Sequence, residues 1–311
     1  MNVVLQVSAS DQQMIHTHYA AYTATSKAPG VIFHAKLPNC VITSYKSGKV
    51  MFQGSAAEQE AKRWGEPPAA TSSSVHSKGD TLPSNFHHLS VIGSDETGTG
   101  DYFGPITVAA VYVPADKIEL MQLLGVKDSK MLTDEKMREM APHIKEACVH
   151  SILVLRNEKY NTIQAKGWSQ GKIKALLHNQ ALGHVLKKMA PEKPDYILID
   201  QFAERGIYYR HVANEKEIVR EHVLFATKAE QLHVAVAAAS ILARDAFLKE
   251  MDRLSGLVAM DLQKGASKKV DEMAAKIWLK HGEDTLKSIT KWHFANTEKA
   301  RAFMLQKRKN Q

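Results

Sequence analysis

The first 65 residues alternate short apolar stretches with turns. This pattern predicts four strands, at 3–7, 31–37, 41–45 and 49–53, and two helices, at about 11–24 and 56–64. Asp11 is expected to cap the first helix. The predicted order is strand, helix, three strands, helix. Such an order indicates a small α+β domain in which helices cover one face of a sheet.

After residue 86 the apolar stretches become longer, and both the two-residue period of strands and the 3.6-residue period of helices occur. Strands are predicted at 89–94, 105–113, 149–155, 196–199 and 222–225. Helical spacing predicts helices at 133–147, capped by Thr133, at 173–189, and from Glu230 onward through the most apolar helix of the chain. The order predicts an α/β fold: a mixed sheet with helices on its faces.

Between these regions lies a stretch without apolar periodicity. It contains Pro67-Pro68, a run of Thr and Ser at 71–74, Gly79 and Pro83, a composition typical of a flexible linker. We therefore expect an N-terminal domain at 1–65, a linker at 66–86 and a larger domain at 87–311.

Composition narrows the choice of partner and compartment. The 41 basic and 33 acidic side chains give a net charge of +8, a mild excess that suits a polyanionic partner. The two cysteines form neither a disulfide framework nor a Cys-x-x-Cys metal site, which fits a reducing cytoplasm. No signal pattern or stretch of 18 apolar residues is present, so neither export nor a membrane span is expected. Nothing indicates an obligate protein partner, and a monomer is expected.

Two adjacent carboxylates, Asp95 and Glu96, carry the strongest chemical signal. A glycine-rich turn follows them, and its glycines allow a bend and let a phosphodiester backbone approach the main chain. Neighbouring strand residues point to opposite faces, so the two acids can share a metal only if the chain bends here. The glycine spacing fits neither the dinucleotide fingerprint nor a P-loop. An acidic surface hairpin is the alternative.

Two further acids follow apolar stretches. Asp200 ends a predicted buried strand, where a charge is costly unless a metal or hydrogen-bond donors satisfy it. Acids at strand ends can meet above neighbouring strands of one sheet, so Asp95 and Asp200 are expected to lie together. Glu230 stands at a predicted helix start, where a favourable interaction with the helix dipole explains it equally well.

Basic side chains suggest where a nucleic acid would bind. At the N-terminal strand tips, Tyr45, Lys46 and Lys49 lie on a predicted open sheet face, with a solvated charged hairpin as the alternative. Lys127 and Lys130 are candidates for phosphate contacts, with a solvated basic loop as the alternative. The histidines occur in no HExxH or GxSxG context.

These motifs resemble those of bacterial ribonuclease HIII, a relative of ribonuclease HII. The matching stretches follow one another along nearly the whole chain, at 45–54, 93–105, 127–130, 175–182, 199–203, 227–230, 237–245 and 293–297. The resemblance implies a ribonuclease H fold for the larger domain. It also implies a substrate-binding N-terminal domain similar to the TATA-box-binding protein fold. The implied activity is endonucleolytic cleavage of the RNA strand of RNA–DNA hybrids, leaving 5′-phosphate and 3′-hydroxyl ends.

The resemblance also implies the site residues. The family's metal-binding catalytic acids fall on Asp95, Glu96, Asp200 and Glu230. Together they would bind divalent cations, Mg²⁺ or Mn²⁺ as a substitute, which activate water and stabilise the leaving oxygen.

Substrate selectivity is expected to differ from that of ribonuclease HII. The Gly-Arg-Gly motif there reads the junction between ribonucleotide and DNA, whereas this chain has Gly98-Thr99-Gly100. We expect Gly98, Thr99 and Gly100 to read the 2′-hydroxyl of RNA, and single embedded ribonucleotides to be poor substrates. Trp168-Ser169-Gln170 departs from the asparagine-rich form of the family. A non-catalytic nucleic-acid-binding protein and a transposase- or resolvase-type nuclease are the alternatives, and neither accounts for the motifs together with the acids.

Overall fold

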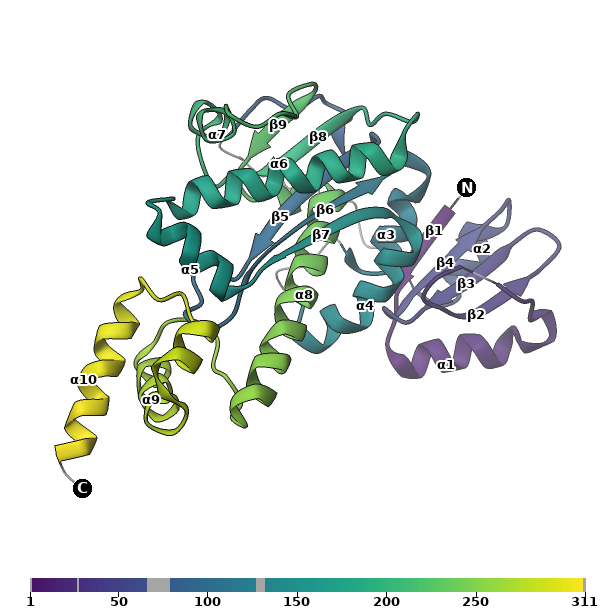
Figure 1. Ribbon diagram of the computed structural model, residues 1–311. Coiled ribbons are helices and arrows are strands. Elements are labelled where there is room, and N and C mark those ends of the chain that lie inside the picture. Colours follow the sequence, from purple (N-terminus) through teal and green to yellow (C-terminus); the bar gives the residue numbers. More distant parts are fainter. Residues whose placement is uncertain (1, 27, 66–78, 127–131, 310–311) are drawn as a thin grey trace.

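The computed structural model describes residues 2–26, 28–65, 79–126 and 132–309, and in this part of the chain it has two β-sheets (Figure 1). The first sheet is antiparallel, with the order β1-β4-β3-β2. Its strands are β1 (Asn2–Gln6), β2 (Val31–Lys36), β3 (Val41–Tyr45) and β4 (Lys49–Gln53). Helices α1 (Ala9–His18) and α2 (Ala57–Lys62) pack on one face of this sheet. The observed order of elements agrees with the predicted one.

Helix α1 differs from the prediction at both ends. Ser8 caps it, because the Ser8 hydroxyl accepts a hydrogen bond from the Asp11 backbone N–H at 3.2 Å. Asp11 lies in the first turn, where its negative charge is favourable to the helix dipole. The helix ends at His18, not near Ala24.

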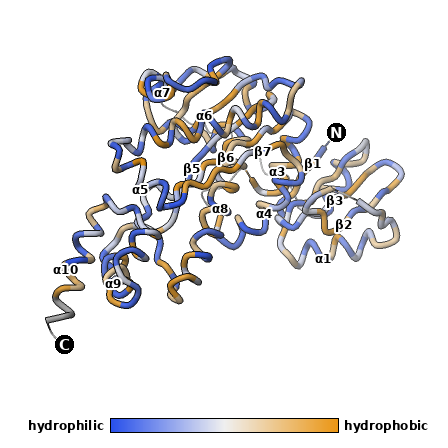
Figure 2. The backbone as a smooth tube through the Cα atoms, in the orientation of Figure 1, coloured by the Kyte–Doolittle hydropathy of each residue, from blue (hydrophilic) through white to orange (hydrophobic). Residues whose placement is uncertain are grey.

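The second sheet is mixed, as predicted, with the order β7-β6-β5-β8-β9. Its antiparallel half consists of β5 (Val91–Thr97), β6 (Ile106–Val113) and β7 (Val149–Leu155). Its parallel half adds β8 (Tyr196–Asp200) beside β5, followed by β9 (Val223–Ala226). Figure 2 shows apolar residues concentrated along β5, β6 and β7, and every residue of β6 is buried, as expected for a strand covered on both faces.

Helices lie on both faces of this second sheet (Figure 1). One face carries α8 (Val234–Val258) with α3 (Ile118–Leu123) and α4 (Asp134–Ala147). The other carries α6 (Gln170–Met189) with α5 (Asn157–Ala165) and α7 (Arg205–His211). Helices α9 (Lys268–Ile289) and α10 (Ala295–Lys309) form a third apolar cluster with the end of α8.

Gly93 lets α8 approach β5 closely. A Cβ at this position would lie 2.2 Å from the Val236 backbone nitrogen, so any side chain would push the helix away. Close packing here brings the first turn of α8 next to the strand that carries the candidate acids Asp95 and Glu96.

The two sheets share part of one core. Tyr45 and Met51, on the face of the first sheet away from α1 and α2, belong to the same apolar cluster as Leu124 and Val126. Ser47 and Lys49 donate hydrogen bonds to backbone carbonyls of α3. This face of the first sheet is therefore partly covered and is not an open platform.

The end of the predicted linker is attached to the larger sheet. Residues 66–78 lie outside the described residues. Gly79 forms a bridge with Ala226, Asp80 accepts a hydrogen bond from the Phe225 N–H at 2.8 Å, and Phe86 is buried. Gly79, Asp80 and Phe86 are thus attached to the larger domain, whereas the remainder of the predicted linker, 66–78, is not described. No helix within the described ranges is long and apolar enough to cross a membrane.

Candidate active site at the ends of strands β5 and β8

Asp95 and Glu96 lie within β5, not after it. Each is paired with a residue of β6, and the strand continues to Thr97. The predicted strand end at Ser94 is therefore wrong, and the bend that would let both acids share one metal is not present. Because the chain stays extended, the two side chains point to opposite faces: Asp95 lies near Ser240 of α8, and Glu96 faces α6.

Glu96 is held by two side chains of α6. Lys174 Nζ donates to one carboxylate oxygen at 2.7 Å, and His178 Nε2 lies 2.9 Å from the other. His178 is fully buried, and its Nδ1 lies 2.8 Å from the hydroxyl of Ser94. Burial alone would raise the pKa of Glu96, but the His178 hydrogen bond and the nearby positive charge lower it below its usual value. Glu96 is therefore an oriented, ionised carboxylate.

Sequence reasoning assigned no role to Lys174 and His178. Their spacing of four residues puts both on one face of a helix, and Ser94 and Glu96, two residues apart, share one face of a strand. The two spacings together are the signal that could have identified this contact.

Asp200 ends β8, as predicted, and lies beside Asp95. The parallel strands β5 and β8 are paired up to the residue before each acid. Burial, together with the negative charges of Asp200 and Glu96, raises the pKa of Asp95 to about 8. Asp200 Oδ1 also accepts a hydrogen bond from the Ala229 N–H at 2.9 Å. The carboxylates of Asp200 and Glu96 therefore both repel that of Asp95 at this end of strands β5 and β8.

Glu230 does not begin α8. It lies in a separate short 3₁₀ helix, Ala229–Gln231, and α8 begins at Val234 with His233 as its cap. The hydrogen bond from Ala229 to Asp200 attaches this short helix to the end of β8. Glu230, with 5% of its surface exposed, is thus a buried acid next to Asp200 in the fold.

These acids suit a divalent cation in charge and donor type. Carboxylate oxygens are preferred ligands of Mg²⁺ and Mn²⁺, and a dication would relieve the repulsion at Asp95. Within the described residues, no three His, Cys, Asp or Glu side chains form a ready metal-binding group. Asp95, Asp200 and Glu230 lie close together, whereas the carboxylate of Glu96 is bound by Lys174 and His178 of α6.

The glycines of the turn after β5 have different roles. Gly98 has φ +93°, and a Cβ there would lie 2.2 Å from the Pro105 carbonyl oxygen. Gly104 has φ +82°, and a Cβ there would lie 2.5 Å from Met251 Sδ. Gly100 is exposed, and a Cβ there would meet no atom within 4 Å. The fold therefore requires glycine at positions 98 and 104, while Gly100 exposes its main chain to solvent.

The residues predicted to contact nucleic acid differ in their exposure to solvent. Tyr45 is 3% exposed in the core between the sheets, and Lys49 donates to a carbonyl of α3, which corrects their predicted position on an open face. Lys46 is exposed. Lys127 and Lys130 lie outside the described residues. Among these basic candidates, Lys46 is the one that the structure places at the surface.

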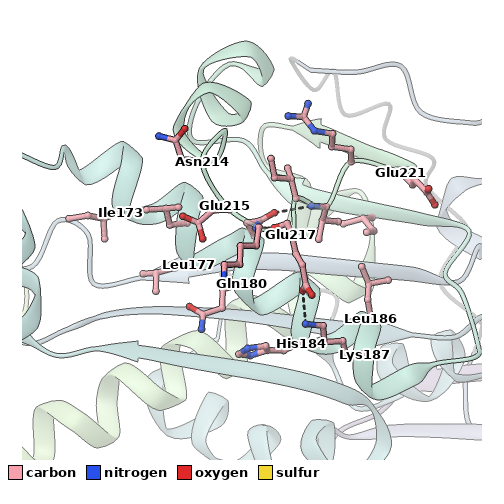
Figure 3. A pocket seen from close by; sticks show the side chains of 18 of the residues that line it. Ile173, Leu177, Gln180, His184, Leu186, Lys187, Asn214, Glu215, Glu217 and Glu221 are labelled. Atoms are coloured by element: carbon pink, nitrogen blue, oxygen red, sulfur yellow. Dashed lines mark hydrogen bonds and ion pairs between the residues drawn. The ribbon is translucent and has the colours of Figure 1, made fainter.

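A large hollow lies elsewhere, between α6 and residues 214–222 (Figure 3). It measures about 1440 Å³, and apolar side chains such as Leu177 and Leu186 line it together with the Lys187–Glu217 ion pair. None of the candidate acids lines it. Cavity size therefore does not identify the candidate active site in this molecule.

Comparisons with known proteins agree with the geometry. Residues 92–297 match the family model described as Ribonuclease HII, and residues 2–77 match a domain of unknown function. The chain is 65% identical over 303 residues to Ribonuclease HIII of Lysinibacillus sphaericus, covering 96% of this chain and 98% of that protein. It is 51% identical over 310 residues to Ribonuclease HIII of Bacillus velezensis, covering 98% of each. A crystal structure of Bst-RNase HIII in complex with Mn²⁺ superposes with a TM-score of 0.71 at 46% identity, covering 98% of this chain and 100% of that chain.

Proposed function

The chain belongs to the ribonuclease HII family and is an endoribonuclease, and from this premise we propose how it cuts its substrate. It hydrolyses the RNA strand of RNA–DNA hybrids with the help of divalent metal ions and leaves 5′-phosphate and 3′-hydroxyl ends. The metal-binding catalytic residues in this proposal are Asp95, Glu96, Asp200 and Glu230.

One observation carries the proposal. Asp95, near the end of β5, and Asp200, the final residue of the parallel strand β8, lie side by side, and the charge of Asp200 contributes to a pKa of about 8 at Asp95. A protein keeps like charges together in a buried place when a cation or a substrate compensates for them. The neighbouring glycine-rich turn gives a phosphodiester backbone access to the same edge.

The candidate acids lie on two faces of β5: Asp95 on the face covered by α8, and Glu96 on the face covered by α6. Asp95, Asp200 and the neighbouring Glu230 would hold a divalent cation, which supplies Lewis-acid activation of water and stabilises the leaving oxygen. Glu96 contributes an ionised carboxylate whose orientation α6 fixes.

Selectivity for RNA is assigned to the turn. Gly98 and Gly100 flank Thr99, and the exposed main chain at Gly100 can approach a 2′-hydroxyl without a side chain in the way. Thr99 has a short neutral side chain, which cannot make the forked phosphate contact of an arginine. The enzyme therefore prefers several consecutive ribonucleotides over a single one.

The N-terminal domain, residues 1–65, is assigned to substrate binding. Lys46, exposed in the turn between β3 and β4, is its candidate phosphate contact. Lys127 and Lys130 remain candidates from the larger domain. Beyond the hybrid, the proposal includes no obligate protein partner, and the protein acts as a monomer in the cytoplasm.

A cleavage assay with matched labelled duplexes tests this function. The substrates are a hybrid with a continuous RNA strand, DNA with one ribonucleotide, single-stranded RNA and duplex DNA, each with Mg²⁺, Mn²⁺ or chelator. We expect metal-dependent cutting of the continuous hybrid, nearly none of the others, and 5′-phosphate ends by mass spectrometry.

Asp200→Asn provides the site-specific arm of the same assay. Removing one charge should lower turnover about 1,000-fold, the equivalent of the several kcal/mol that charge stabilisation supplies. Asp116→Asn, at an exposed acid before α3, is the matched control and should cut normally. Near-normal cutting by Asp200→Asn would contradict the site, and equal cutting of the single ribonucleotide would contradict the role given to Thr99.

A further inference from the structure

A buried lysine from the end of the chain holds the glycine-rich turn. Lys291 is fully buried, and its Nζ donates to the backbone carbonyls of Asp101 at 2.8 Å, Gly104 at 2.6 Å and Pro105 at 3.3 Å. A buried ammonium group is costly unless hydrogen bonds satisfy it. Here all three acceptors belong to one turn, so the lysine fixes the path of that turn.

The main chain around Lys291 strengthens this attachment. The Lys291 N–H donates to the Tyr102 carbonyl at 2.8 Å, and the Gly104 N–H donates to the Ile289 carbonyl at 3.0 Å. The segment between α9 and α10 thus runs alongside residues 102–104 and pairs with them. The side of the turn that leads into β6 is held by this segment.

The other side of the turn is held by the first residue of α6. Gln170 Nε2 donates to the Thr99 carbonyl at 2.9 Å and lies 3.3 Å from the Tyr160 hydroxyl. This carbonyl adjoins Gly100, where the main chain is exposed. Gln170 therefore determines where the bare part of the turn lies.

The same helix face also positions the acid. Gln170, Lys174 and His178 follow one another at intervals of four residues, so they lie in one row along α6. Lys174 and His178 hold Glu96, while Gln170 holds Thr99. A single rigid helix thus fixes the distance between the acid-bearing strand and the turn.

We propose that Gln170 and Lys291 are positioning residues for recognition of the RNA strand: they hold the Thr99–Gly100 main chain at the place where it meets a 2′-hydroxyl. They act through the turn and do not touch the reacting atoms. This inference rests on the proposed function, because it assumes that the turn reads RNA.

The test measures coupling between each side chain and one 2′-hydroxyl. A DNA duplex with a block of four ribonucleotides is compared with versions in which one of the four is 2′-deoxy. In the unaltered enzyme, removing the 2′-hydroxyl that the turn reads should lower kcat/KM at the mapped cleavage position. In Gln170→Ala and Lys291→Met, kcat/KM on the all-ribonucleotide block should fall at least about tenfold, and the 2′-deoxy penalty should shrink about fivefold or more.

Matched controls come from neighbouring residues of the same type. Gln164→Ala, on α5, and Lys287→Met, an exposed lysine near the end of α9, should keep both kcat/KM and the penalty. Thermal unfolding of each variant gives the folded fraction by which rates are normalised. Gln170 is only partly buried, so its variant decides the question if Lys291→Met does not fold.

The possible outcomes distinguish failure of this inference from failure of the proposed function. Folded variants that lose activity but keep the full 2′-deoxy penalty would show a purely structural role and overturn the inference alone. An unaltered enzyme that cuts the hybrid without any 2′-deoxy penalty would also overturn it. An unaltered enzyme that cuts no hybrid would instead overturn the proposed function.

Discussion

Gly98 and Gly100 are separated by one residue, yet the protein uses them differently. Gly98 is confined by the Pro105 carbonyl and has a positive φ, whereas Gly100 faces open space. The absence of a side chain serves packing at the first position and access at the second.

We therefore predict opposite effects of alanine at these glycines. Gly98→Ala should lower the free energy of unfolding by about 2 kcal/mol or more, because strain and a backbone clash combine. Gly100→Ala should change it by less than about 0.5 kcal/mol but lower kcat/KM on hybrids at least about tenfold. Denaturant unfolding and cleavage kinetics measure both. Equal losses of stability would contradict the distinction.

At the residue scale the sequence identified acids better than their partners. Asp95 and Asp200 follow from apolar runs that end in a charge, and the structure brings them together. Lys174 and His178 escaped notice because a helix surface offers many polar side chains, and only the packing of α6 on β5 selects these two. Tyr45 was misplaced because burial depends on a partner sheet far along the sequence.

At the scale of elements, the beginning of α8 depends on one neutral histidine. His233 Nδ1 accepts from the Ala235 N–H at 3.1 Å, and His233 Nε2 lies 3.1 Å from the Leu89 carbonyl oxygen, to which it donates. A protonated imidazole could not accept the first bond. Burial lowers the pKa of His233 to about 4.

This cap predicts a pH dependence of stability. The folded-state pKa lies below the unfolded value of about 6.5, so the unfolded chain binds the proton first as pH falls. The contribution is fully present above about pH 6.5 and is lost as pH falls toward 4; its size is about 3 kcal/mol. Urea unfolding from pH 7 to 4.5 measures it. His233→Asn, which can still cap the helix, should flatten this part of the profile, and an unchanged slope would contradict the assignment.

Strands were predicted more accurately than helix starts. β3, β4 and β7 match the expected ranges because turns with glycine or polar residues bound their apolar runs. The start of α8 was placed too early, because the 3₁₀ helix before it merges with the apolar run in the sequence.

At the scale of the whole molecule, the two sheets meet where the turn that carries Lys46 packs on α3. The turn that carries Lys46 lies against the end of α3, since Ser47 donates to the Leu123 carbonyl. Lys127 and Lys130 follow shortly after this point in the sequence. The sequence predicted two domains but not their shared core, because nothing local in Tyr45 or Met51 indicates a distant apolar partner.

Lys46→Ala should therefore weaken hybrid binding in a salt-dependent way. Loss of one phosphate contact should reduce the slope of log K against log salt by about 0.9. Lys62→Ala, on the exposed surface of α2, is the control and should keep the slope. Fluorescence anisotropy with labelled hybrid, measured from about 50 to about 300 mM salt, gives the slope for both variants. Identical slopes for the two variants would remove Lys46 from the binding surface.

The attachment of the turn by Lys291 also orders events during synthesis. All the candidate acids lie between residues 95 and 230, whereas Gly265 and Lys291, which bind the turn, come later. Chains emerge from the ribosome N-terminus first. A growing chain therefore has its candidate acids before it can fix the glycine-rich turn, and a chain released before residue 291 would lack the hydrogen bonds that Lys291 donates to that turn. The segment that carries Lys291 must therefore be synthesised before the turn can take the conformation seen in the structure.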